Sequence, residues 1–517
     1  MTTPRKLFLS IDIGTTAIKT GLFTSDGKLI AMEKREQKLI FLGFGRVEQS
    51  IQETWRLITE LVRMLMKDQV ADEVSAIALS VQRGSVIPLD ATGMPLSNQI
   101  VWMDNRGLPF VEWLHNNIGL EAYYNISGHG LSHITGVSKL LWLRHGDPTL
   151  WERIKVIGTP QTLFLKWLGC KDFICDLSSG TYIFPFDVDR KIWSQELAAK
   201  LDFPIEKLPK LVTATEVVGT LSQAAAKELG LKSGISLVAG GGDGQCAAAG
   251  CGVITPGLGM INIGTGAGVQ CYLQTPLRDP ACVLSLAAHV VTDGWEMEGH
   301  TQASGAVLRW LRDEFGYPEK VLAVNSQSDA FDFMIDQARS VAPGAEGLLL
   351  IPTFNGSTGP KVDLYARGIL MGLSLSHERK HIIRAFLEGI TLEIRWMLDA
   401  IIHTGASIKD LRLVGGGSRN QFWNQIHADI LNHPISTLEQ SEAALVGAAM
   451  CAVVAVGEYQ NLSEAATQFV RIKETIDPLT SNHQIYQVAY EKYKEIFTLL
   501  SEKGIHSDVN KQVHHIK

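Results

Sequence analysis

The chain has 517 residues, of which 45% are hydrophobic and 20% are charged. It can therefore bury a large core and is not intrinsically disordered. Its 47 basic and 54 acidic residues give a formal net charge of −7, which argues against a dedicated binder of nucleic acid or anionic membranes, because such proteins need a net basic face. This length predicts two large domains or about three ordinary ones.

The cysteines and the N-terminus predict a soluble cytoplasmic protein. The seven cysteines are odd in number and include no Cys-x2-Cys pair, so reduced core thiols are expected rather than disulfides or zinc ligands. The first residues lack the design of a signal peptide. The longest uncharged stretch, 244–277, is interrupted by proline, glycines and polar residues, so it lacks the run of about 20 apolar residues that a membrane span needs.

Strand and helix patterns alternate from the start of the chain. Apolar segments at 7–13 and 18–23 predict strands, and Ser25-Asp26-Gly27 is a hairpin turn signal before a returning strand at 28–32. Residues 52–67 have the apolar spacing of an amphipathic helix, and 74–81 reads as a buried strand. This mixture predicts an α/β protein.

An internal repeat is the most informative feature of the sequence. The segment Ser10-Ile-Asp-Ile-Gly-Thr-Thr-Ala17 lies 250 positions before Met260-Ile-Asn-Ile-Gly-Thr-Gly-Ala267. In each segment an apolar strand turns through Gly-Thr, where backbone N–H groups and a hydroxyl can face a phosphate. The alternative is a chance recurrence of two Gly-Thr hairpins. If the repeat is genuine, the chain holds two similar domains that face each other across a cleft.

The domain boundary is expected in the glycine-rich segment 250–259. We therefore predict an N-terminal domain over 1–253 and a C-terminal domain over 254–500. Residues 501–517 are mostly polar, and we expect them to form a poorly ordered tail.

One carboxylate stands in an unusual glycine setting. Gly240-Gly-Gly-Asp243-Gly-Gln245 follows an apolar strand, and the glycines leave room for a ligand to approach Asp243 closely. Such a carboxylate suits a general base that acts on a substrate hydroxyl. The alternatives are a solvated turn aspartate and a dinucleotide-binding loop, but no acidic residue ends a second strand about 20 residues later.

Two further clusters carry groups that suit a small polar ligand and a phosphate. Arg83 ends a predicted strand, and Trp102 and Asp104 follow an apolar pair, so together they offer hydrogen bonds and an aromatic surface to a polyhydroxylated molecule. The alternative is an Asp104–Arg106 ion pair and a core tryptophan. Gly415-Gly-Gly417 precedes a predicted helix, whose N-terminal amides can complement negative charge; a plain strand-to-helix turn is the competing interpretation.

Taken together, these motifs resemble the FGGY carbohydrate kinases, and most closely the xylulokinases. The resemblance runs from about residue 7 to residue 499, with the motifs in the family's order. They are Asp12-Ile-Gly-Thr-Thr16, Val47-Glu-Gln49, Trp102-x-Asp104-x-Arg106, Gly240-Gly-Gly-Asp243, Ile263-Gly-Thr265, Ala366-Arg-Gly368, Leu387-Glu-Gly389 and Gly415-Gly-Gly417. It implies two ribonuclease-H-like domains of the actin, hexokinase and heat-shock chaperone ATPase superfamily.

The resemblance also implies a set of site residues for ATP, Mg²⁺ and a sugar or polyol. Asp243 is expected to be the catalytic base, and Asp12, acting through water, is expected to organise Mg²⁺ together with Asp243. The residues expected to bind the nucleotide are Thr15, Thr16, Lys19, Gly264, Thr265, Gly305, Arg309, Gly416 and Asn420. Those expected to face the acceptor are Arg83, Gly84, Trp102, Asp104 and Gln245. The resemblance allows a homodimer.

The sequence indicates the phosphoryl acceptor less directly than it indicates the kinase reaction. A ketopentose such as xylulose is the first expectation. However, Gln82-Arg83-Gly84 differs from the Gln-Met-His-Gly that xylulokinases usually carry, and its arginine is closer to glycerol kinases. Glycerol, another polyol or a sugar acid therefore remain alternative acceptors. A nucleotide-dependent binding or chaperone-like protein of the same fold is the alternative from another class.

Overall fold

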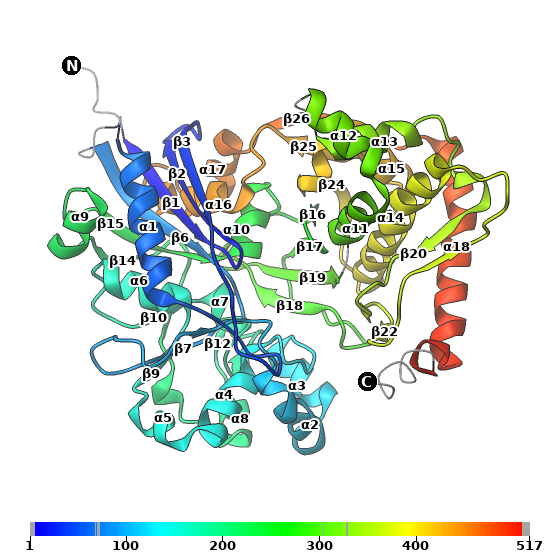
Figure 1. The fold of residues 1–517 in the computed structure, drawn as a ribbon. Helices are drawn as coiled ribbons and strands as arrows, with labels where there is room; N and C mark the ends of the chain where they lie inside the picture. Colours follow the sequence, from blue (N-terminus) through cyan, green and yellow to red (C-terminus); the bar gives the residue numbers. More distant parts are fainter. Residues whose placement is uncertain (1–5, 68, 70–72, 303, 327–328, 509–517) are drawn as a thin grey trace.

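Two β-sheets that share an arrangement of six strands form the centres of two lobes (Figure 1), and the second sheet has one more strand at its edge. The computed structural model describes residues 6–67, 69, 73–302, 304–326 and 329–508. The first sheet has the order β14-β15-β6-β1-β2-β3 and the second the order β18-β19-β17-β16-β24-β25-β26. The strands of the first sheet are β1 (Leu7–Ile13), β2 (Ala17–Thr24), β3 (Leu29–Glu36), β6 (Val74–Val81), β14 (Val217–Thr220) and β15 (Ser236–Gly242). Those of the second are β16 (Gly257–Ile263), β17 (Ala267–Leu273), β18 (Ser285–Ala288), β19 (Trp295–Thr301), β24 (Ile408–Gly415), β25 (Ile435–Leu438) and β26 (Ile472–Ile476).

The pairing of the strands confirms the expected two-domain α/β fold. In the first sheet β1 is antiparallel to β2 and parallel to β6, which is in turn parallel to β15. In the second sheet β16 is antiparallel to β17 and parallel to β24, which is in turn parallel to β25. Each sheet also carries an antiparallel strand beyond its last parallel one, β14 or β26. The repeated segments of the sequence thus end the equivalent strands, β1 and β16.

The two Gly-Thr turns differ in length by one residue. Ile13 pairs with Ile18 across the first turn, whereas Ile263 pairs with Ala267 across the second. The sequence alignment of the repeat, which matches Ala17 with Ala267, therefore does not match the strand register. The second turn is tighter, and its residue 266 is a glycine where the first turn has Thr16.

Alternate residues of the central strands face different helices. Leu7, Leu9, Ile11 and Ile13 of β1 pack in one core cluster with α1 (Ile51–Leu65), while Phe8 packs on the opposite side. This period of two is the pattern of a strand that is buried on both faces. The helices that pack in the same cluster as α1 are α6 (Pro160–Leu168) and α9 (Gln223–Leu229).

Two helices exchange places between the lobes. α10 (Asp243–Gly250) follows the last parallel strand of the first sheet, yet Ala247 and Ala248 pack with Met260 and Val414 of the second sheet. α16 (Ala443–Ala455) comes from the second half of the chain and packs against β1, β6 and β15 of the first sheet. Each lobe therefore covers one face of its sheet with a helix from the other half of the chain.

Glycines allow α10 and α16 to cross in close contact. A Cβ atom on Gly250 would lie 2.0 Å from the carbonyl oxygen of Ala443, and one on Gly447 would lie 1.9 Å from that of Cys246. Neither position has room for a side chain. The close crossing ties the two lobes together behind the ends of β1 and β16.

The other helices cover the second sheet or form an insertion in the first lobe. α14 packs with β16 and β17 in the main core cluster of the second lobe, together with residues of α15 and α18. The helices of the second lobe are α11 (Gly305–Phe315), α12 (Tyr317–Ser326), α13 (Ala330–Ala338), α14 (Arg379–His403), α15 (Gln421–Leu431) and α18 (Thr480–Glu502). α17 (Leu462–Phe469) instead packs beside α16, in the core cluster that contains Phe8 and Phe23 of the first sheet. Those of the first-lobe insertion are α2 (Leu108–Asn117), α3 (Leu120–Ser127), α4 (Gly136–Gly146), α5 (Pro148–Arg153), α7 (Leu177–Thr181) and α8 (Gln195–Lys200).

Short strand pairs complete the fold. They lie outside the main sheet in the first lobe, where one group of three strands forms a single small sheet, and beside α14 and β19 in the second lobe. Those of the first lobe are β4 (Ile40–Phe41), β5 (Val47–Gln49), β7 (Ile87–Leu89), β8 (Gln99–Ile100), β9 (Val156–Gly158), β10 (Ile174–Asp176), β11 (Phe186–Asp187), β12 (Ile192–Trp193) and β13 (Lys210–Val212). Those of the second lobe are β20 (Leu349–Ile351), β21 (Ser357–Thr358), β22 (Val362–Asp363) and β23 (Ile369–Met371).

Several smaller expectations can be compared with the structure. The expected boundary after residue 253 falls in the segment between α10 and β16. The expected tail is in part folded: helical turns continue to residue 508 and His506 is buried, while 509–517 lie outside the described residues. All seven cysteines are free thiols. No helix of the described residues is long and apolar enough to cross a bilayer.

Candidate active site

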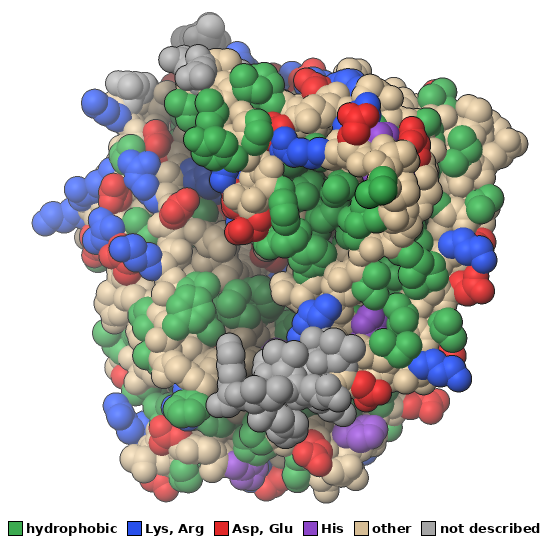
Figure 2. Space-filling view, turned by 45° about the vertical axis from the view of Figure 1, so that its right-hand side comes forward, with side chains coloured by type: hydrophobic (Ala, Val, Ile, Leu, Met, Phe, Trp, Pro, Cys, Tyr) green, Lys and Arg blue, Asp and Glu red, His purple; other side chains and the backbone are tan. Residues whose placement is uncertain are grey.

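Three parallel strands of the first sheet bring the expected site residues to one edge. Ile13, Val81 and Gly242 are in register at the carboxyl ends of β1, β6 and β15. Asp12 and Asp243 therefore lie at the same edge of the sheet, and the negative charge of Asp243 raises the pKa of Asp12. Ligands of open α/β sheets bind at this edge. The space-filling view shows the surface hollowed between the two lobes (Figure 2).

The first Gly-Thr turn is held by side chains from the strands around it. Gln37 Nε2 donates to the carbonyl oxygen of Gly14 (2.7 Å) and Gln49 Nε2 to that of Thr15 (2.6 Å). Thr15 Oγ1 donates to Gln82 Oε1 at 3.1 Å. Because two of its carbonyl oxygens are already hydrogen-bonded, the turn is less repulsive to a phosphate than a free loop is. Thr16 is exposed at its tip.

Asp12 is a buried carboxylate beside a lysine. Ser80 Oγ donates to Asp12 Oδ1 at 2.8 Å, and Lys19 Nζ lies 3.7 Å from Oδ2. Burial raises the pKa of Asp12 to about 6, with a further increase from Asp243 and an opposing effect from Lys19. Lys19 also pairs with Glu442, at the start of α16, at 2.6 Å. The expected phosphate-binding lysine therefore already contacts the second half of the chain.

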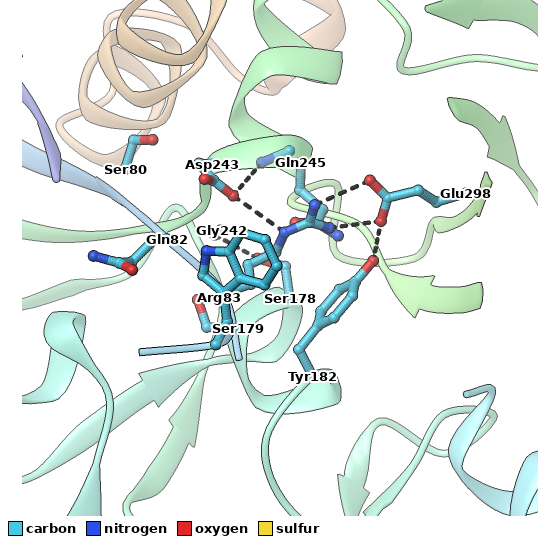
Figure 3. A network of polar contacts seen from close by, with 12 residues as sticks. Ser80, Gln82, Arg83, Ser178, Ser179, Tyr182, Gly242, Asp243, Gln245 and Glu298 are labelled. Carbon is cyan, nitrogen blue, oxygen red and sulfur yellow. Dashed lines mark hydrogen bonds and ion pairs between the residues drawn. The ribbon is translucent and has the colours of Figure 1, made fainter. Parts of the chain in front are cut away.

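Asp243 and Arg83 form an ion pair at the start of α10 (Figure 3). Arg83 Nε donates to Asp243 Oδ1 at 3.1 Å, and the Gly244 N–H donates to the same oxygen at 2.8 Å. Among the described residues no hydrogen bond to Oδ2 is seen. Burial raises the pKa of Asp243 above its usual value, and Arg83 opposes that rise. The carboxylate is thus fixed through Oδ1, while Oδ2 has no hydrogen bond from a described residue.

Glu298 of β19 reaches from the second sheet to the same arginine (Figure 3). Arg83 Nη1 and Nη2 donate to its two oxygens at 2.8 and 3.0 Å, and the phenol of Tyr182 donates to it as well. The guanidinium lies 4.2 Å from the centre of the Tyr182 ring. Burial alone would raise the pKa of Glu298, but Arg83 and His300 outweigh it and hold the pKa well below its usual range.

The glycines around Asp243 make room for Arg83. A Cβ on Gly242 would lie 2.8 Å from Arg83 Cδ, and one on Gly244 would lie 2.7 Å from Arg83 Cζ. Gly240 has a φ of +70°, and its Cβ would overlap the carbonyl oxygen of Leu79. The sequence suggested that these glycines admit a ligand. The structure shows that the space beside Gly242 and Gly244 is taken by the guanidinium group.

The other expected acceptor residues surround this ion pair. Trp102 Nε1 donates to Thr15 Oγ1 at 2.9 Å, so the tryptophan is tied to the first Gly-Thr turn. Gly84 has a φ of +71°, and a Cβ there would lie 2.8 Å from the carbonyl oxygen of Ile134. Gln245 is fully buried and donates to Glu296 at 3.1 Å, so it belongs to the interior of the network.

Asp104 has a different place from the one expected. Its carboxylate is fully buried and accepts hydrogen bonds from the Val47 N–H (2.6 Å) and from the guanidinium and backbone N–H of Arg106. All of these partners belong to the loops that surround it. We therefore correct the expectation that Asp104 faces the acceptor: it holds the loop that carries Trp102, as in the ion-pair alternative.

The second Gly-Thr turn is joined to the start of α11. The N–H groups of Gly305 and Ala306 donate to the carbonyl oxygens of Gly264 (3.1 Å) and Thr265 (2.9 Å). A Cβ on Gly305 would lie 2.2 Å from the Gly264 oxygen. Gly264 and Thr265 are exposed, as is Arg309 one turn into the helix. The structure therefore places these four expected nucleotide residues side by side.

The glycine cluster after β24 lies next to that turn. A Cβ on Gly415 or Gly417 would lie 2.5 Å from atoms of Ile263, so both glycines pack against the end of β16. Gly416 between them is exposed and has open space around its Cβ position. Asn420 caps α15, with its side chain accepting from the N–H groups of Phe422 and Trp423. Gly416 thus borders the second turn, while the Asn420 side chain is occupied by the helix.

Several residues of the network were not anticipated. Tyr182, Gln270, Glu296 and Glu298 are buried around Arg83, and burial raises the pKa of Glu296 well above its usual range. Glu296 and Glu298 had a signal in the sequence: they alternate with apolar residues in Trp295–Thr301, so both point to one face of a strand. Tyr182 follows a short helix with no such pattern.

Comparison with known proteins places the chain in a family. The N-terminal domain model of the FGGY family of carbohydrate kinases matches residues 7–250, and the C-terminal domain model matches 259–456. The chain belongs to the FGGY family of carbohydrate kinases, as the motifs predicted. It is therefore a sugar kinase, with two α/β lobes and a small-molecule sugar as its substrate.

Individual relatives differ in their acceptors. The chain is 28% identical to the xylulose kinase of Bacillus subtilis (strain 168) over 497 residues, covering 95% of this chain and 97% of that protein. It is 25% identical to the gluconokinase of the same organism over 498 residues, covering 96% of each. The fold is also that of a xylulose kinase from Lactobacillus acidophilus, with a TM-score of 0.88 at 24% identity over 96% of this chain and 98% of that one.

Proposed function

We propose that this kinase transfers the γ-phosphoryl group of ATP to a hydroxyl of a ketopentose, with xylulose as the first candidate. The observation that carries the proposal is Asp243, held at the edge of the first sheet with one free carboxylate oxygen. The xylulose kinases at 28% identity support the choice of acceptor. Gluconokinases at 25% and 27% identity make a sugar acid the competing class. A kinase that consumes ATP is expected in the cytoplasm.

Asp243 has the position that a catalytic base needs. Hydrogen bonds from Arg83 and Gly244 fix Oδ1, so Oδ2 can orient the attacking hydroxyl and accept its proton as the bond to phosphorus forms. Burial raises the pKa of Asp243, and a carboxylate with a raised pKa is a stronger base than a solvated one. Because phosphoryl transfer passes through a loose transition state, positioning contributes more than a strong base does.

The two Gly-Thr turns and α11 are the proposed nucleotide site. Thr15, Thr16 and Lys19 would bind phosphate oxygens from the first lobe, and Gly264 and Thr265 would do so from the second. The residues proposed for the adenosine end are Gly305, Arg309, Gly416 and Asn420. They lie at or near the carboxyl ends of β16 and β24, with exposed backbone at 264, 265 and 416.

The oxygens of Asp12 and Asp243 fit a hard divalent cation such as Mg²⁺. Asp12 is buried beside Lys19, and its pKa is raised to about 6 chiefly by burial. A cation nearby would stabilise its charged form. When bound, Mg²⁺ supplies neutralisation of the phosphate charge. Asp12 would hold its hydration shell, and Lys19 would balance the remaining charge.

A panel of acceptors tests this function. Purified protein is incubated with ATP, Mg²⁺ and each of several ketoses, polyols and sugar acids, and ADP release is followed. The greatest kcat/KM is expected for xylulose. Turnover of gluconate or glycerol above that of every ketose would overturn the proposed acceptor. Absence of ADP release with the whole panel would contradict the proposed reaction.

A further inference from the structure

Glu298 belongs to one lobe and acts in the acceptor site of the other. It lies on β19, whose neighbours are β17 and β18 of the second sheet, but its carboxylate pairs with Arg83 at the end of β6 in the first. Its side chain is 1% exposed and that of Arg83 is 13% exposed. This ion pair is therefore a fixed part of the site rather than a surface contact.

The ion pair occupies the guanidinium group of Arg83. Both Nη atoms bind Glu298 and Nε binds Asp243, while the Tyr182 ring covers one face of the group at 4.2 Å. Arginine recognises a carboxylate through two parallel N–H bonds of this kind. Glu298 already makes that bidentate pair, so the two Nη atoms of Arg83 are not available to bind the carboxylate of a ligand in the same way.

The charge around Arg83 also disfavours an acidic ligand. One guanidinium stands between two carboxylates, Glu298 and Asp243. The lysine of the site, Lys19, is likewise paired, with Glu442 and Asp12. Like charges in a buried site repel strongly because water does not screen them. A neutral polyhydroxylated molecule meets no such penalty and can bind the remaining N–H groups and carboxylate lone pairs.

We propose that Glu298 is a specificity-determining residue, which makes the acceptor site select neutral sugars and polyols over sugar acids by neutralising Arg83. The proposal rests on the proposed sugar-kinase function and narrows its acceptor class. It also explains how an arginine in the position of Arg83 serves a neutral substrate. Without Glu298 the same guanidinium is a binding site for a carboxylate.

The test compares the binding of two acceptors to Glu298→Gln. Dissociation constants for D-xylulose and D-gluconate are measured by titration calorimetry, in the same buffer for the wild-type protein and the variant. The ratio of the two constants is expected to shift toward gluconate by about tenfold or more. Glu319→Gln is the matched control: Glu319 is a buried carboxylate on α12 that pairs with Arg379, and its substitution should leave the ratio unchanged.

Glu298→Asp covers the case in which the glutamine variant does not fold. The shorter side chain keeps the charge but withdraws from the bidentate geometry, so a smaller shift of about twofold to fivefold is expected. An unchanged ratio in whichever variant folds overturns the proposal, as does a wild-type protein that binds gluconate more tightly than every neutral acceptor. Binding is read without turnover, so absence of kinase activity would contradict only the proposed function.

Discussion

At the scale of single residues, the site depends on one carboxylate oxygen. Asp243 has two hydrogen bonds to Oδ1, from Arg83 and Gly244, which hold the group in one orientation. The sequence indicated Asp243 through the glycines beside it. It did not indicate that the absence of side chains at these glycines leaves room for Arg83, because that depends on β6 and β15 lying side by side.

Asp243→Asn should reduce kcat by about 10²–10⁴-fold, because the amide keeps the size of the side chain but cannot accept the proton. The dissociation constant of a non-hydrolysable ATP analogue, measured without Mg²⁺, should stay within about twofold, since Asp243 belongs to the proposed metal site and the residues proposed to bind the nucleotide lie elsewhere. Initial rates and a fluorescence titration measure the two quantities. A variant that retains the wild-type kcat would remove Asp243 from the mechanism.

At the scale of elements, α14 contains an ionisable group in its buried face. Glu393 is 3% exposed, and its Oε2 has no hydrogen-bond partner among the described residues. Burial raises the pKa of this carboxyl to about 8. A carboxylic acid that is neutral at pH 7 packs like an amide, which explains how the helix tolerates glutamate in its core.

Glu393→Gln should therefore stabilise the protein at high pH. The raised pKa means that the folded state holds a proton that the unfolded state releases, so this contribution to stability is complete below about pH 4.5 and is lost as pH rises through 8. The glutamine variant does not titrate. Its advantage in free energy of unfolding should be about 1–3 kcal/mol larger at about pH 9 than at about pH 6. Denaturant unfolding at both pH values measures this free energy. The same difference between variant and wild type at the two pH values would contradict the raised pKa of Glu393.

At the scale of the whole molecule, the crossing of α10 and α16 holds the two lobes together. Gly250 and Gly447 bring the helices into backbone contact, and the N-terminal ends of the same two helices carry Asp243 and Glu442. Glu298 and Lys19 add two ion pairs that join the halves of the chain near the site. The lobes are thus connected both behind the site and within it.

Gly447→Ala tests this crossing, because packing and helix propensity predict changes of opposite sign in the free energy of unfolding. In an open helix alanine is more stable than glycine by about 1 kcal/mol. Here the added methyl group would lie 1.9 Å from the carbonyl oxygen of Cys246, so the helices must separate, at a cost of about 1–3 kcal/mol. The midpoint of urea unfolding should fall. Gln468→Ala, at an exposed position of α17, is the control and should change it little; a higher midpoint for Gly447→Ala would show that the crossing is looser than described.

The sequence alone determined the family, the α/β class, the pair of Gly-Thr turns and the importance of Asp243. These features lie in short contiguous segments, where the order of apolar residues and glycines fixes the local backbone. Only the tertiary structure decided which partners the charged groups take. Asp104 pairs with Arg106 in its own loop, whereas Arg83 pairs with a glutamate 215 positions away. A buried charge is costly unless an opposite charge lies next to it, and the fold decides which residue that is. The packing of α10 and α16 against strands from opposite halves of the chain could not be predicted either, because it depends on which strands lie beside these helices in the folded molecule.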